Sequence, residues 1–250
     1  MPQPSACKPD TPEKKKEKMG ADLGNAVKSI PAYVEKSDFV TVVAPGCLHA
    51  DRRDPRTNLR AKTCYRTYRN RGWCVLEVFA SRLSRDQCFP VLLITSKEGT
   101  PEWFSPLETQ HLAVGTSEFT CCQRNHIFGN KIVPCDRGVT RTILQRMIQA
   151  KTAHLFELKS TMQARLTTCF TNWWLRTDSS SPISTENIDA FKTLLGWDCE
   201  FWNDENGVSI LVYAVIRNNA NAVQALLNNA KCTEERLNTL HFKNSSVIEF

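Results

Sequence analysis

The sequence predicts a mixed α/β protein, in which a parallel sheet with helices precedes an all-helical C-terminal segment. Two short apolar runs, residues 39–44 and 89–95, are typical of strands that are buried on both faces. Between them, Val75, Leu76 and Phe79 recur at helical spacing. A strand, a helix and a strand in this order predict a βαβ unit with parallel strands and a right-handed crossover.

The segments around these strands differ in composition. Residues 1–20 are rich in proline and lysine and almost free of apolar side chains, so we expect a disordered tail. From Ala21, apolar residues at helical spacing predict a pair of helices that ends near Lys36. The polar, arginine-rich insertion 47–71 shows no periodicity, and we assign it to a long loop between the first strand and the next helix.

After the second strand, the pattern changes from short β-like pieces to a long helix. Residues 119–123 and 131–134 are such pieces, and the Asn and Gly residues between them favour a hairpin turn. Asp136 is expected to cap the helix that follows. The predicted apolar stripe of this helix comprises Val139, Ile143, Met147, Ala150, either His154 or Leu155, and Leu158.

Helical patterns continue toward the C-terminus and complete the predicted domain organisation. We expect helix up to Trp174, a linker at residues 177–182, and a helix over residues 186–195 with Ser184 as its cap. After the tail, the chain is therefore divided into three parts. They are an α/β domain (residues 21–135), a helical connector (residues 136–176) and a helical C-terminal segment (residues 183–250).

Composition and charge limit the class of protein. The longest apolar runs fall far short of the roughly 18 to 20 residues that cross a bilayer, so we expect no membrane span. The 11 cysteines are an odd number, and no apolar leader precedes them, which predicts reduced thiols and a cytoplasmic location. The net charge of +6 is concentrated in residues 51–85, which hold ten basic and three acidic side chains. The remainder is near neutral, which argues against a general polyanion binder.

Five residues beside the predicted βαβ unit form a motif. Ser37 and Asp38 lie directly before the first strand, and Trp73, Cys74 and Glu77 open the helix after the insertion. This arrangement resembles the second half of a Toll/interleukin-1 receptor (TIR) domain. The resemblance implies an incomplete, flavodoxin-like parallel sheet with helices. It also implies a role in signal transduction and TIR-type self-association.

The same resemblance implies a catalytic role for Glu77, because members of the family that cleave NAD use the glutamate of this motif. A fixed carboxylate stabilises the positive charge that develops on the sugar when nicotinamide leaves. Trp73, Arg66 and Arg69 would then contact the nucleotide, with NAD as substrate and no resident cofactor. The alternative is that Glu77 is a solvated helix carboxylate paired with a neighbouring arginine.

Four soft metal ligands, Cys121, Cys122, His126 and Cys135, lie within fifteen residues. Thiolates and imidazoles are the ligands that Zn²⁺ prefers. The adjacent cysteines would, however, point to opposite faces of the predicted strand, and the spacing matches no known zinc finger. We therefore favour buried cysteines that act as small hydrophobic side chains, and we expect no metal.

Residues 60–73, which run from the insertion into the following helix, also interleave arginine and lysine with Tyr65, Tyr68 and Trp73. Such a composition is typical of surfaces that stack bases and neutralise phosphates. A solvated loop has the same composition, and the arginines could instead hold the phosphates of a nucleotide near Glu77. Because the charge is local, we disfavour nucleic acid as a partner.

Residues 204–230 resemble one ankyrin repeat. Asp204 and Gly207 fall at the turn positions of that family, Ser209 at the helix cap, and Leu211 and Ala214 in the first apolar stripe. The resemblance implies a segment that binds protein partners, with these residues as its signature. One repeat cannot bury its own apolar faces, because these faces pack against neighbouring repeats. A stable stack needs about three repeats.

Three classes of function remain open. The first, our main expectation, is a non-catalytic interaction or signalling protein that binds protein partners through the ankyrin-type segment. The second is an NAD-cleaving enzyme that uses Glu77. The third is a basic nucleic-acid-binding module.

Overall fold

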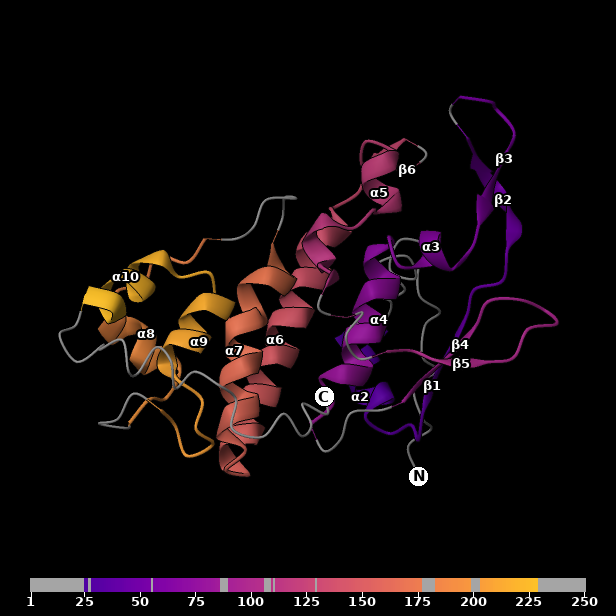
Figure 1. Cartoon of the computed structure of the whole chain (residues 1–250). Coiled ribbons are helices and arrows are strands. Elements are labelled where there is room, and N and C mark those ends of the chain that lie inside the picture. Colours follow the sequence, from indigo (N-terminus) through magenta and orange to yellow (C-terminus); the bar gives the residue numbers. More distant parts are fainter. Residues whose placement is uncertain are drawn as a thin grey trace, which may run out of the picture.

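The computed structural model describes residues 25–26, 28–54, 56–85, 90–105, 109, 111–128, 130–176, 183–198 and 203–228, without the side chains of residues 50–52 and 128. A small sheet with its helices lies at one end, a group of short helices lies at the other, and two long helices lie side by side between them (Figure 1). The predicted tail and linker, and residues 229–250 of the C-terminal segment, lie outside the described residues.

The predicted parallel strand pair is present. Strands β1 (Val40–Val43) and β4 (Val91–Ile94) pair in parallel and lie within the two apolar runs. A third strand, β5 (Glu102–Trp103), pairs with β4 in the antiparallel direction. The described sheet is therefore mixed, in the order β1-β4-β5, and not wholly parallel as predicted.

Helix α4 (Gly72–Arg82) connects the two parallel strands and buries the predicted apolar stripe. Its first residue lies against the ring of Phe119, and a Cβ atom on Gly72 would collide with that ring. The helix α2 (Ile30–Val34) packs on α4, and the Arg85 guanidinium donates to the Glu35 carboxylate just after α2, at 2.9 Å. These contacts make α4 the centre of the α/β core.

The insertion 47–71 is not the long loop that its composition predicts. Strands β2 (Cys47–Arg53) and β3 (Arg60–Thr63) form an antiparallel hairpin, and the helical turn α3 (Tyr65–Tyr68) follows. The hairpin projects away from the sheet (Figure 1). None of its described side chains is buried, so no alternation of apolar and polar residues marks these strands in the sequence.

The prediction for residues 119–123 is wrong, because Thr120–Gln123 forms a helical turn, α5. A shorter hairpin forms instead, between β6 (Ile127–Phe128), which lies in the predicted turn, and β7 (Lys131–Ile132), which lies in the second predicted piece. Phe119 is only 2% exposed and belongs to the α/β core. The β-like pattern of residues 119–123 therefore comes from one buried aromatic residue, Phe119, directly before a helical turn.

Helices α6 (Asp136–Glu157) and α7 (Thr161–Leu175) confirm the long helices predicted in the middle of the chain. The N-cap position of α6 is occupied by Cys135, so Asp136 is the first helical residue and not the cap. The 3₁₀ helix η2 (Val114–Thr116) packs against the first of these helices.

The buried face of α6 is rotated from the predicted stripe. Val139, Ala150 and Leu158 are exposed. The buried residues are Thr140, Ile143, Leu144, Met147, Ile148 and Leu155. The rotation follows from the packing, because α6 contacts α7 along one side and α4 and η2 along another. A single narrow stripe of apolar residues cannot cover both of these contact surfaces of α6.

The described part of the C-terminal segment is helical, as predicted. It contains α8 (Ile188–Leu194), α9 (Ile210–Ile216) and α10 (Ala220–Asn228). Helix α9 packs on α7, and α10 packs on both α8 and α9. Helix α10 is thus attached to the rest of the chain through its contacts with α8 and α9.

The predicted cap of α8 is wrong. Asn187 occupies the N-cap position, and its Oδ1 accepts a hydrogen bond from the Ala190 amide at 2.8 Å. Ser184 is buried instead, and its hydroxyl oxygen accepts a hydrogen bond from Asn172 Nδ2 at 2.6 Å. This contact ties the start of the C-terminal segment to α7.

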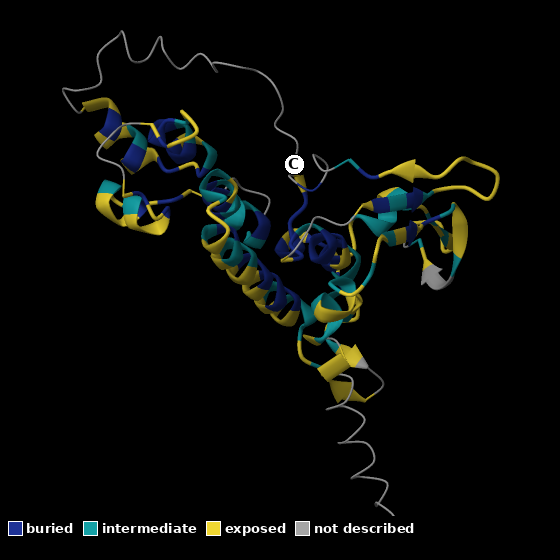
Figure 2. Ribbon diagram, turned by 90° about the horizontal axis from the view of Figure 1, so that it is seen from below, coloured by how far each residue is buried: buried dark blue, intermediate teal, exposed yellow. Residues whose placement is uncertain are grey.

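Among the described residues, the buried side chains form two hydrophobic cores, one in the α/β part and one among α7 to α10. Figure 2 shows the buried positions in dark blue. Helix α7 contributes to both, since Trp174 is buried in the first core and Cys169 in the second. Among the described residues, no helix is both long enough and apolar enough to cross a membrane.

Candidate functional site

Glu77 lies in the second turn of α4, on the side that faces away from the core. The neighbouring side chains of Leu76 and Val78 are buried, whereas that of Glu77 is exposed. The hydroxyl group of Tyr68, from α3, donates to Glu77 Oε2 and also to the carbonyl oxygen of Cys74, at 3.4 Å in each case. The insertion therefore contacts the motif helix at the predicted catalytic residue.

Three groups at this contact have shifted pKa values. Although the Glu77 side chain as a whole is exposed, partial burial of its carboxylate raises its pKa, against the hydrogen bond from Tyr68 and the charge of Arg71. Burial and then the charge of Glu77 raise the pKa of Tyr68. Burial also raises the pKa of Cys74 to about 11. The hydroxyl and thiol groups are thus protonated at neutral pH.

The arginine whose charge acts on Glu77 is Arg71, which sequence reasoning did not select. The Arg69 guanidinium lies 5.9 Å from the centre of the Tyr65 ring, and Arg66 is exposed on α3. The available signal was the position of Arg71 directly before α4, two residues from Trp73, which opens the motif.

Trp73 has a structural contact that the motif alone does not predict. Its indole Nε1 donates to Asp136 Oδ2 at 3.2 Å, and the ring packs against the α/β core. This hydrogen bond connects the start of α4 to the start of α6. Because Asp136 follows Cys135, the contact also places the motif helix next to the cysteine cluster.

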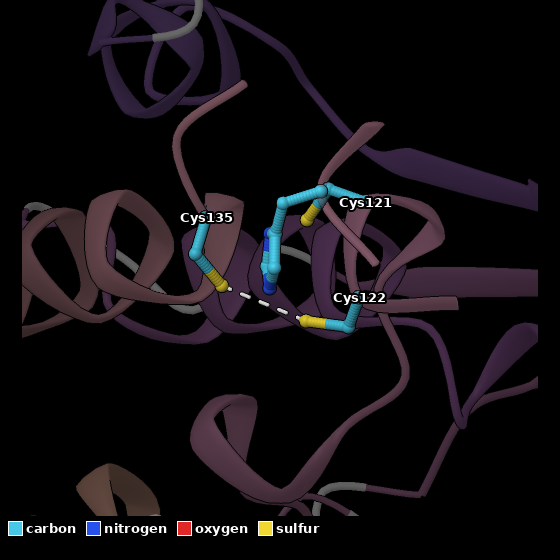
Figure 3. A group of neighbouring side chains, drawn as sticks. Cys121, Cys122 and Cys135 are labelled. Carbon is cyan, nitrogen blue, oxygen red and sulfur yellow. Dashed lines mark hydrogen bonds between the residues drawn. The ribbon is translucent and has the colours of Figure 1, made fainter. Parts of the chain in front are cut away.

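The cysteine cluster, Cys121, Cys122, His126 and Cys135, is assembled from α5, the turn after it and the N-cap of α6. One potential ligand atom from each residue lies within 4.8 Å of all the others. The sulfur atoms of the three cysteines point toward one another, and Cys122 Sγ and Cys135 Sγ are 3.5 Å apart (Figure 3). The structure therefore brings together all four residues.

The expected divergence of the adjacent cysteines does not occur, because they lie on a helical turn and not on a strand. Successive helical residues differ by about 100° of rotation, so both thiols can face one side. The backbone then doubles back, with the His126 amide donating to the Cys121 carbonyl oxygen at 2.7 Å. Asn125 and His126 have φ values of 50° and 59°, in the left-handed region that permits this reversal.

The two thiols in contact differ in acidity. Burial, followed by hydrogen bonds with Cys135 and Cys121, raises the pKa of Cys122 to about 11. The pKa of Cys135 is lowered despite burial, because the Arg137 backbone and the other two thiols donate hydrogen bonds to it. A thiolate therefore forms first at Cys135, where the N-terminus of α6 stabilises negative charge.

The predicted ankyrin-type turn is built around the buried carboxylate of Asp204. Its Oδ1 accepts hydrogen bonds from the amides of Asn206 and Val208, both at 2.9 Å, and its Oδ2 accepts one from the Tyr213 hydroxyl at 2.8 Å. Gly207 has a φ of 77°, which few residues with a side chain adopt. These bonds fix the loop that leads into α9.

The other predicted protein-binding residues shape the same unit. Ser209 caps α9, with its hydroxyl oxygen accepting from the Leu211 amide at 3.2 Å. Leu211 is 9% exposed and Ala214 is fully buried. A partner docked on this unit would therefore touch the neighbours of these residues and not the residues themselves.

Arg165, in the second turn of α7, is the residue that sequence reasoning missed most clearly. Its side chain is 2% exposed, and its Nη1 lies 3.3 Å from Asp204 Oδ2 and from Glu205 Oε2. The guanidinium also lies 4.8 Å from the centre of the Trp197 ring. The available signal was its position beside Ala164 and one turn before Cys169, on the face of α7 that is buried.

A second arginine joins α7 to the C-terminal helices. Arg217 Nη1 donates to the Thr168 carbonyl oxygen at 2.9 Å, and its Nη2 lies 2.6 Å from Glu186 Oε1. The pKa of Glu186 is lowered, because the hydrogen bond and charge of Arg217 outweigh burial, which acts to raise it. The C-terminal helices are therefore attached to α7 by two buried guanidinium groups.

Comparison of the chain with family models, with curated proteins and with solved structures found no match. The fold and its sites define a mixed α/β protein with a small sheet and several helices.

Proposed function

We propose that this chain is an interaction protein of a signalling assembly, in which the TIR-like part carries an ankyrin-type segment that binds a protein partner. The observation that carries the proposal is a second apolar stripe on α9 and α10, which the described part of the chain leaves incompletely covered. We call it the outer stripe, and it comprises Val212, Val215, Ile216, Val223 and Leu227.

The outer stripe differs from the fully buried side chains of the unit, and its exposed members are Val215 and Leu227, whereas Ile216 and Val223 also pack against the second core. On α9, Ile210, Tyr213 and Ala214 are buried, whereas Val215 is 62% exposed. On α10, Ala222 and Leu226 are buried, whereas Leu227 is 44% exposed. A helix that faces water on its outer side normally carries polar residues there. Apolar residues on both sides are typical of a helix that is covered twice, as in a stack of repeats.

The attachment of this unit to α7 supports a binding role, because the contacts with α7 fix the backbone of the unit before a partner binds. Arg165 and Arg217 fix α9 and its preceding loop to α7, and Ser209 caps the helix. A surface ordered in advance loses less conformational entropy on binding. Val215 and Leu227 would thus be presented in fixed positions.

Photo-crosslinking tests the proposal. Benzoylphenylalanine is placed at Val215, at Leu227 or, as a control, at the exposed α6 residue Gln145. We expect a crosslinked product of defined mass from the two outer-stripe positions alone. The product at Leu227 should disappear when Val215→Asp is added, a change at an exposed site that should cost no more than about 0.5 kcal/mol of stability. Equal products at Gln145, or products that survive Val215→Asp, would contradict the proposal.

A second candidate function, polyanion binding, is favoured by the projecting hairpin. Its exposed basic side chains include Arg53, Arg56, Arg60 and Lys62, and few other elements contact it. If four phosphates are neutralised, the logarithm of the affinity for a single-stranded oligonucleotide falls with that of the salt concentration, with a slope of about −3. Arg60→Gln should reduce the slope by about 0.7. A slope near zero would exclude this candidate.

A further inference from the structure

The cysteine cluster has the dimensions of a tetrahedral metal site. Bonds of about 2.3 Å from Zn²⁺ to sulfur place two sulfur atoms about 3.8 Å apart. Cys122 Sγ and Cys135 Sγ are 3.5 Å apart, and all four ligand atoms lie within 4.8 Å of one another. Small rotations of the side chains would thus complete a coordination shell.

The segment that holds the ligands lacks a hydrophobic core of its own. From Thr120 to Val139, no described side chain is buried, and Ile127 and Ile132 are 51% and 87% exposed. Two-residue strands and consecutive left-handed residues add little stability, because the left-handed conformation itself costs about 1 kcal/mol or more per residue. Apolar burial within this segment therefore does not account for its ordered fold, whereas ligation would.

The surroundings of the cluster suit a negatively charged metal complex. Three thiolates and one neutral imidazole around Zn²⁺ carry a net charge of about −1. The cluster sits at the N-terminus of the 22-residue helix α6, where the Asp136 amide donates to Cys121 Sγ at 3.4 Å. The guanidinium of Arg137, in the first turn of α6, adds a positive charge.

The imidazole of His126 supplies an independent sign of a missing ligand. Its Nδ1 atom is buried and has no hydrogen-bond partner among the described residues. A buried polar atom is normally paired, and an unpaired ring nitrogen beside three thiols is what a soft metal ion requires.

We propose that Cys121, Cys122, His126 and Cys135 bind one Zn²⁺ ion in a closed, structural site that fixes the α5 turn and the β6–β7 hairpin to the start of α6. Four protein ligands leave no open position for a water molecule or a substrate. Binding converts the protonated thiols to thiolates and releases their protons to solvent. The ion would order a surface segment next to the Trp73–Asp136 contact.

Metal analysis of the full chain, purified with reductant and without chelator, tests the site. We expect about one zinc ion per chain in the unsubstituted protein. Cys122→Ser and Cys135→Ser should each reduce the content to near zero. Cys64→Ser, at an exposed cysteine that caps α3, is the matched control and should retain the metal, because serine is itself a good cap.

A measurement on the unsubstituted chain keeps the test decisive if a variant does not fold. After zinc is removed, added Co²⁺ should give thiolate-to-metal charge-transfer absorption and the visible bands of a tetrahedral complex. Chelator should also speed tryptic cleavage after Arg124 and Lys131. A chain without zinc and without cobalt absorption would overturn the proposal. A Cys122–Cys135 disulfide that persists in the protein purified with reductant would overturn it as well.

Discussion

Arg165→Met tests how the buried ion pair supports the C-terminal helices. The methionine side chain fills a similar volume but leaves the Asp204 carboxylate, which is fully buried, without its cation. It also removes the hydrogen bonds that the guanidinium donates to the carbonyl oxygens of Leu195 and Gly196, at 3.3 and 3.2 Å. The variant therefore leaves one buried charge and two carbonyl groups unpaired.

The expected loss is large. Removing one partner of a buried pair costs about 3–5 kcal/mol, because the remaining charge is uncompensated. With an m-value of about 2 kcal/mol/M, a loss of about 4 kcal/mol lowers the urea midpoint by about 2 M. Glu205→Gln is the matched control. Glu205 lies at the same 3.3 Å from Arg165 Nη1, but its side chain is 50% exposed. Its loss should cost no more than about 1 kcal/mol.

Urea unfolding measured by tryptophan fluorescence provides the assay. Trp197, whose ring centre lies 4.8 Å from the Arg165 guanidinium, contributes to this signal together with the other five tryptophans of the chain. A loss below about 1 kcal/mol in Arg165→Met would refute the reasoning. Equal losses in the two variants would show that burial does not distinguish the two carboxylates.

Three further predictions concern the α/β core, pH and catalysis. Gly72→Ala should lower the free energy of unfolding by about 1–3 kcal/mol through the clash with the aromatic ring, whereas Gly46→Ala, with open space around it, should change it by less than about 0.5 kcal/mol in thermal melts. Because the pKa of Glu186 is lowered on folding, its pairing with Arg217 should stabilise the protein above the ordinary value of 4.5 and be lost as the pH falls through the lowered value. Urea midpoints measured across that range should show this loss, and Glu186→Gln should flatten it. Finally, nicotinamide release from NAD should not exceed a buffer blank, and release that Glu77→Gln abolishes would instead establish an enzyme.

The elements that were predicted correctly bury regular apolar patterns. The helical spacing of α4 meets the core on the face that periodicity selects. The apolar runs located β1 and β4 correctly, but the expected burial on both faces is wrong for β1, where Thr41 and Val43 are exposed. None of the described side chains of the β2–β3 hairpin is buried, so its strands left no periodic signal. Apolar periodicity predicts a helix or strand only when one face of that element is buried, so it does not reveal an element that projects into solvent.

The candidate site shows the same dependence on local structure. The four metal ligands were visible in the sequence, but a strand assignment for Cys121 and Cys122 separated their side chains, and a helical turn brings them together. Arg165 was missed for another reason, although it lies on the buried face of α7. Charged helical residues usually face water, and only the three-dimensional arrangement reveals Asp204 as its buried partner.

Helix α7 is shared between the two hydrophobic cores, with Cys169 in one and Trp174 in the other. Such sharing couples their equilibria, because unfolding either core removes packing from the same helix. The two halves should therefore lose structure in a single cooperative transition. A substitution in the C-terminal helices would then accelerate hydrogen exchange in the sheet, although no side chain near the sheet has changed.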